Sequence, residues 1–132
     1  SSWNSETTFR KNTATTGGAV YIVNNCTTSF NDKTTFDTNA ASEAQGGALS
    51  IQYSHVYFRD KAIFAGNTAT IFGGAVAVMA EISTSDRGSP FVLAGPTVFE
   101  NNSSETYGGA LGMIGGVLIK LETTETRFSG NR

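Results

Sequence analysis

The sequence predicts an all-β fold, a right-handed parallel β-helix (solenoid) built from repeated coils. Three observations predict it: one short motif occurs five times, a second motif follows the first at a similar distance, and apolar residues alternate along the chain after the second. Repeats of about 20–50 residues are typical of solenoids, in which each repeat packs only on its neighbours.

The first motif is Phe-x-x-Asn. Its phenylalanines are Phe9, Phe36, Phe64, Phe99 and Phe128, and its asparagines are Asn12, Asn39, Asn67, Asn102 and Asn131. Successive phenylalanines are 27, 28, 35 and 29 residues apart. The longer third interval contains residues 81–96, which are rich in Ser, Asp, Gly and Pro, and we expect them to form a loop inserted in an otherwise regular coil.

The second motif is Gly-Gly-Ala followed by Val or Leu, and it comes after each of the first four Phe-x-x-Asn motifs. Its glycine pairs are Gly17-Gly18, Gly46-Gly47, Gly73-Gly74 and Gly108-Gly109. We expect each pair to supply a positive φ and a close approach between backbones at a corner of the coil. The small alanine would keep that corner narrow.

Apolar side chains alternate after each Gly-Gly-Ala, as in Val20-Tyr21-Ile22 and Leu49-Ser50-Ile51. A period of two predicts a strand with one buried face. A second strand is expected around Phe30, Phe58, Phe91 to Leu93 and Leu118 to Leu121, and a third ends at the Phe of each Phe-x-x-Asn. Since no helical periodicity lies between them, we predict about four to five coils of three short strands.

Stacked coils place equivalent side chains over one another, about 4.7–4.9 Å apart. We therefore expect the five phenylalanines to form an internal stack and the five asparagines to form a ladder of side-chain amides at a bend. The asparagines themselves are expected to tolerate the left-handed backbone conformation that a sharp bend requires. Both motifs are interpreted as core and corner, because buried ladders cannot contact a ligand.

The chain is expected to be part of a longer repeat protein. It starts and stops inside a coil and shows no N-terminal signal segment. We therefore interpret residues 1–132 as a single uncapped β-helix segment. Exposed strand edges at both ends would then pair with continuing coils of the same protein or with neighbouring subunits.

Composition and charge disfavour several functional classes. Lys and Arg number 9 and Asp and Glu 11, for a formal net charge of −2, and no basic run is present. Binding to nucleic acid or to an anionic membrane therefore has little electrostatic support. The most apolar stretch, Gly108 to Leu121, contains five glycines and Lys120, and it is too short and interrupted to span a bilayer.

Few residues suggest catalysis or metal binding. Asp32 and Asp60 occupy matching places beside Lys33 and Lys61, and stacked acids on a β-helix can bind calcium or cleave polysaccharide. We favour solvated turns with local ion pairing instead, because the following coils do not continue the acidic column. His55, the one histidine, stands in a polar turn without other metal ligands, so we predict no catalytic residue, metal or cofactor.

Three further positions carry weaker expectations. Cys26, the one cysteine, is expected to be a free, partly buried thiol. Asn25 and Asn101 fit the acceptor pattern for N-glycosylation in a eukaryotic secretory host, whereas Asn102, which also fits it, should point inward. Phe72 and Tyr107 precede Gly-Gly in adjacent coils and are expected to stack on each other outside the core.

The pairing of Phe-x-x-Asn with Gly-Gly-Ala-(Ile/Leu/Val) resembles the repeat of the chlamydial polymorphic outer membrane proteins, the Pmp-like repeat family. The resemblance extends from Phe9 to Asn131 and rests on four paired copies in register. It implies the β-helical passenger of an autotransporter, exposed on the cell surface and associated with adhesion. Related repeats occur in other bacterial and protist surface proteins.

We therefore expect a structural or adhesive module of an extracellular surface or filament protein, and not an enzyme. It would act as a rigid stalk or as a binding surface for a host-cell, matrix or glycan ligand. One alternative is a carbohydrate-active lyase or hydrolase that uses Asp32, Asp60, Lys33, Lys61 and Arg59. Another alternative is a passive spacer.

Overall fold

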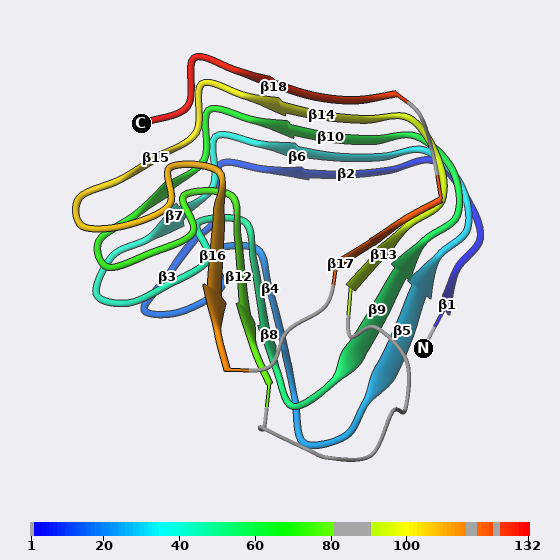
Figure 1. Cartoon of the computed structure of the whole chain (residues 1–132), viewed down its shortest axis with the longest axis horizontal. Coiled ribbons are helices and arrows are strands. Elements are labelled where there is room, and N and C mark those ends of the chain that lie inside the picture. Colours follow the sequence, from blue (N-terminus) through cyan, green and yellow to red (C-terminus); the bar gives the residue numbers. More distant parts are fainter. Residues whose placement is uncertain (1, 81–90, 116–118, 123–124) are drawn as a thin grey trace.

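The structure is a computed structural model that describes residues 2–80, 91–115, 119–122 and 125–132. Within these residues the chain forms only strands and turns, and parallel strands stack as a β-helix of about four turns. Successive coils run counter-clockwise while they approach the viewer in Figure 1, which is the right-handed sense. The predicted fold class is confirmed.

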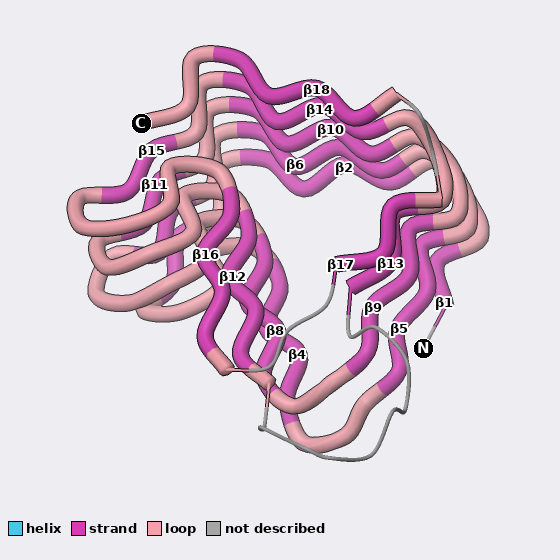
Figure 2. The backbone as a smooth tube through the Cα atoms, in the orientation of Figure 1, coloured by secondary structure: helices cyan, strands magenta, loops and turns pink. Residues whose placement is uncertain are grey.

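Four parallel sheets form the sides of each coil (Figure 2). Sheet A contains β1 (Ser2–Trp3), β5 (Thr27–Phe30), β9 (His55–Phe58), β13 (Phe91–Leu93) and β17 (Ile119–Leu121). Sheet B contains β2 (Thr7–Arg10), β6 (Thr34–Asp37), β10 (Ala62–Ala65), β14 (Thr97–Glu100) and β18 (Thr126–Ser129). Sheet C contains β3 (Thr13–Ala14), β7 (Ala40–Ala41), β11 (Thr68–Ala69) and β15 (Ser103–Ser104). Sheet D contains β4 (Val20–Val23), β8 (Leu49–Gln52), β12 (Val76–Met79) and β16 (Leu111–Ile114).

Three of these sheets correspond to the three strands expected in each coil, and sheet C is an addition. Its strands have only two residues each, which is too short for an alternating pattern to be visible in the sequence. Residues 81–90 of the expected loop and Leu118 lie outside the described residues. Phe91–Leu93, also within the expected loop, form β13 and pair with β9 and β17.

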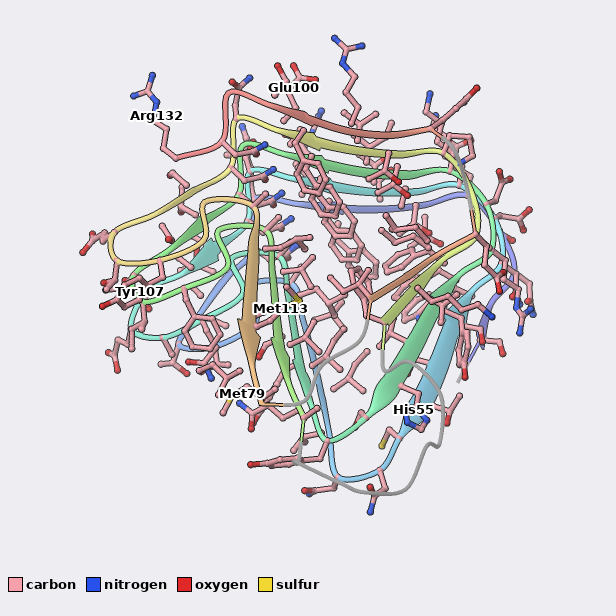
Figure 3. All side chains as sticks on the ribbon, in the orientation of Figure 1. His55, Met79, Glu100, Tyr107, Met113 and Arg132 are labelled. Carbon is pink, nitrogen blue, oxygen red and sulfur yellow. The ribbon has the colours of Figure 1, made fainter. Side chains whose placement is uncertain are left out.

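The core is a column of stacked rings beneath sheet B. Phe9, Phe36, Phe64, Phe99 and Phe128 are register partners from coil to coil. Neighbouring ring centroids are 4.8–4.9 Å apart and nearly parallel, at 1–11°. A second column beneath sheet A includes Phe30 and Phe58, whose rings meet the first column edge-on at 5.6–6.4 Å. Figure 3 shows the rings piled inside the coil.

The left-handed bend of Phe-x-x-Asn lies one residue earlier than the sequence suggested. The residue before each asparagine has a positive φ, and these residues are Lys11, Thr38, Gly66, Asn101 and Gly130, at 53–62°. The asparagines have ordinary φ values, so the expectation that they occupy the left-handed position is wrong. Their place is instead fixed by the hydrogen bonds described below.

The two glycines of Gly-Gly-Ala are required for different structural reasons. The first has a φ of 58–69° in all four copies. At the second, a Cβ would collide with backbone of the next coil; at Gly18, for example, it would meet the carbonyl oxygen of Gly47. The first position requires glycine for its conformation and the second for space.

The outer face of sheet D is partly covered, which the alternating pattern did not predict. Ser50 and Ala77 point away from the core and are nevertheless fully buried. Phe72 of the coil before the last one lies over Gly112 of the last coil, where a Cβ would collide with the Phe72 ring. Phe72 is 8% exposed and Tyr107 is 71% exposed. Their backbones form a bridge, but the described residues show no ring contact between them, so the expected stack is wrong.

We predict that Phe64→Ala lowers the free energy of unfolding by about 3–5 kcal/mol, because it opens a cavity in the middle of the ring stack. Phe128→Ala is the matched control, since Phe128 has one ring neighbour and is 53% exposed. Denaturant titration of both variants measures the difference. Equal losses would contradict the proposed packing.

Thr38→Gly should stabilise the protein by about 0.5–1 kcal/mol, because a β-branched residue is strained at a φ of 55°. Gly66 already occupies the equivalent place in the next coil. Thr35→Gly, three residues earlier in β6, should instead destabilise by a similar amount. Thermal unfolding of the two variants tests this, and a loss of stability in both would refute it.

Candidate functional site

The asparagine side chains form a continuous ladder through the molecule. In each coil the backbone N–H and the Nδ2 of the asparagine donate to Oδ1 of the asparagine in the next coil, at 2.9–3.0 Å. Nδ2 of Asn39 also donates to the carbonyl oxygen of Phe9, and the later asparagines repeat this contact with the phenylalanine one coil before.

An inner asparagine thereby uses its whole amide. Asn67, for example, accepts two hydrogen bonds at Oδ1 and donates two from Nδ2. Asn39, Asn67 and Asn102 are fully buried. A satisfied buried amide stabilises a unique arrangement, whereas an unpaired one would be costly. The ladder positions are therefore inaccessible to a ligand in the inner coils.

Charged side chains join neighbouring coils on the surface. Arg10 Nε donates to Asp37 Oδ2 at 2.7 Å, and Lys33 Nζ pairs with Glu6 at 2.8 Å. Hydrogen bonds from the Thr38 hydroxyl and from Arg10 lower the pKa of the Asp37 carboxyl below its ordinary value. Exposed pairs of this kind contribute little to stability.

Among the residues that the structure describes, neither Asp32 nor Asp60 forms an ion pair. Asp32 and Asp60 are both exposed, and Asp60 Oδ1 accepts a hydrogen bond from the backbone N–H of Lys61. Gly95 lies so close over Asp60 that a Cβ there would collide with the Asp60 backbone. No acidic side chain can therefore follow Asp60 in this column.

The remaining sequence candidates are scattered. His55 begins β9 rather than lying in a turn, and it pairs with Thr27. Cys26 is exposed, so the expectation of a partly buried thiol is wrong. Among the residues that the structure describes, no cluster of three metal-ligating side chains is found.

The glycosylation candidates lie at exposed bends. Asn25 and Asn101 are both exposed, with φ values of 58° and 53°. Asn102 is fully buried, and its amide is engaged in the ladder. The structure leaves the attachment of sugar to Asn25 and Asn101 a prediction.

A shallow groove of about 360 Å³ lies on the outer face of sheet A, at the ends of β9, β13 and β17. It is lined by Tyr57, Phe58, Arg59, Val92, Ala94, Lys120 and Glu122. The Arg59 guanidinium lies 5.7 Å from the centre of the Tyr57 ring, within cation–π range. Lys120 and Glu122 form an ion pair of 3.0 Å.

Sequence reasoning named Arg59 and missed the other residues of the groove. Tyr57, Val92 and Lys120 are 35 and 28 residues apart in the chain, and only their strand register brings them together. Alignment of the repeats could have found this neighbourhood, because the register that places Phe58 beside Leu93 also places Tyr57 beside Val92.

These features define a parallel β-helix repeat protein whose repeated motifs form the core and the bends of each coil. The sequence profile of the Chlamydia polymorphic membrane protein (Chlamydia_PMP) repeat matches residues 6–23 and 96–112. Each matched segment contains one Phe-x-x-Asn and one Gly-Gly pair.

The chain is also 32% identical over 117 residues to a protein of Chlamydia pneumoniae described as "Probable outer membrane protein pmp7". The alignment covers 80% of this chain and 11% of that relative, so the chain spans about a tenth of its length. No solved structure matches significantly. Both comparisons thus support a similarity between the repeats of this chain and those of the Pmp-like family. Separately, its described residues contain no helix suited to crossing a membrane.

Replacing Asn67 with alanine should lower the free energy of unfolding by at least about 3 kcal/mol. The change leaves the Asn39 backbone N–H, the Phe36 carbonyl and the Asn102 Oδ1 short of a partner inside the protein. Asn12→Ala is the control, because Asn12 is exposed at the end of the described ladder. Urea unfolding should show a loss several times smaller for Asn12→Ala, and comparable losses would exclude the ladder as a main determinant.

Proposed function

We propose that this chain is a structural and adhesive module on the outside of a cell, where the β-helix serves as a rigid stalk that also presents a binding surface. The observation that carries the proposal is the 32% identity, over most of the chain, to a protein described as an outer membrane protein. The stacked coils support it, because a solenoid of this kind extends in one direction and holds its surface side chains in fixed columns.

The proposal includes partners of two kinds. Further coils of the same protein or of a neighbouring subunit would pair with the strand edges of the first and last coils. A host-cell, matrix or glycan ligand would contact the outer faces of the sheets, since the asparagines of the inner coils are buried. The groove on sheet A is the strongest candidate for that contact among the surfaces that the structure describes.

Surface location can be tested with an antibody against the folded chain. The antibody should label intact cells of the source organism as strongly as permeabilised cells. Labelling that requires permeabilisation would refute an outer location.

Adhesion can be tested with beads that carry the purified chain. They should attach to cultured animal cells or to matrix-coated wells more than beads that carry Phe64→Ala, which we expect to be destabilised. Attachment at the level of bare beads would favour a passive spacer. Breakdown of a polysaccharide by the soluble chain would favour the enzymatic alternative instead.

A further inference from the structure

We propose that the groove on sheet A binds one acidic sugar unit, a pyranose ring that carries a negative charge, within a polysaccharide. The inference deepens the proposed adhesive function and rests on it for its biological setting. It is argued from the shape of the groove, from the pairing of its charged groups and from the chemistry that remains available to a ligand.

The shape of the groove follows from the register of three coils. Tyr57, Val92 and Lys120 are successive partners in sheet A, and Arg59, Ala94 and Glu122 are equivalent residues of the same three coils. The middle coil therefore contributes short side chains to the floor, while the coils on either side contribute long ones to the walls. The walls are two strand spacings apart, about 9.5 Å.

The walls cover most of Val92, which is 6% exposed, and leave Ala94 of the floor partly exposed. In one wall, the Arg59 guanidinium lies over the Tyr57 ring. In the other wall, Lys120 forms an ion pair with Glu122. Among the described residues, Arg59 has no carboxylate within ion-pair distance. A guanidinium thus stands at the edge of the groove with donors available for an anion.

The free chemistry of the groove matches an acidic sugar. Ala94, with the small exposed part of Val92, offers an apolar floor to the C–H face of a pyranose ring, beside the Tyr57 ring. The planar guanidinium of Arg59 suits a carboxylate or a sulfate, because each of these anions presents two oxygens that can accept two parallel N–H hydrogen bonds. Glu122 and Lys120 can accept from and donate to ring hydroxyls.

Two magnitudes favour a single sugar unit over a general polyanion surface. A volume of about 360 Å³ is at the small end of ligand sites. The chain has a net charge of −2, so its overall field repels a polyanion, and binding must come from the local site.

The test uses immobilised polysaccharides and the purified chain at roughly 0.15 M salt. Hyaluronan provides carboxylates alone, dextran sulfate provides sulfates alone, and dextran is neutral. Binding to hyaluronan or dextran sulfate but not to dextran supports the inference, and the better of the two identifies the anion. Equal binding to dextran, or binding to none of the three, overturns it.

Arg59→Gln should weaken binding at least tenfold, while Arg127→Gln should leave it unchanged. Arg127 is exposed on sheet B, so its replacement removes the same charge at a distance from the groove. Equal losses in both variants would mean that net charge controls binding and would overturn the inference. Ala94→Phe, which fills the floor, should also abolish binding, and thermal unfolding checks that each variant is folded.

The bead assay separates failure of this inference from failure of the adhesive function. If beads with the unaltered chain attach to cells and beads with Arg59→Gln attach equally well, the groove is not the adhesive site. If the unaltered chain binds an acidic polysaccharide through Arg59 but its beads do not attach to cells, the groove inference stands and the adhesive function fails.

Discussion

The hydrogen bonds between asparagine amides of successive coils are the constraint on which the rest of the structure depends. Each inner amide bonds to the coil before it and to the coil after it, and its Nδ2 also reaches the phenylalanine carbonyl one coil back. A coil that slipped by one residue would break all of these bonds inside the protein, where water cannot replace them. The register of the strands is therefore fixed at one bend, and the neighbouring sheet carries it along.

Fixed register has consequences on both sides of the ribbon. Inside, it places the Phe36 ring directly over Phe9 and under Phe64, so that ring contacts are made at nearly constant spacing. Outside, the shape of the surface depends on the sizes of the side chains that the register places next to one another in successive coils. A long side chain, a short one and another long one in three successive coils produce a groove, as Tyr57, Val92 and Lys120 do. Such a surface can change while the core is preserved.

The sequence predicts the repeated part of this structure well, because five copies of one motif remove the ambiguity of a single short strand. Ring columns and sheet order follow from spacing alone. The motif favours Asn39 for the left-handed bend, because asparagine commonly adopts that conformation and threonine does not, yet the bend lies at Thr38. Only the backbone path, fixed by the amide bonds of Asn39, reveals which of the two is bent.

Other features depend on contacts between coils that no single repeat encodes. Ser50 and Ala77 are buried on an outward face, where the backbone of Gly46 approaches Ser50 and that of Gly73 approaches Ala77. The two-residue strands of sheet C are held by pairing above and below rather than by their own pattern. The groove likewise combines residues from three successive coils.

The corner between sheets D and A has a practical consequence. Three residues separate β4 from β5, two separate β8 from β9, and eleven separate β12 from β13, yet the strands on both sides keep their partners in register. A connection whose length is free while its anchors are fixed is a natural insertion point. Foreign peptides of about ten residues could be grafted there for display without rebuilding the scaffold.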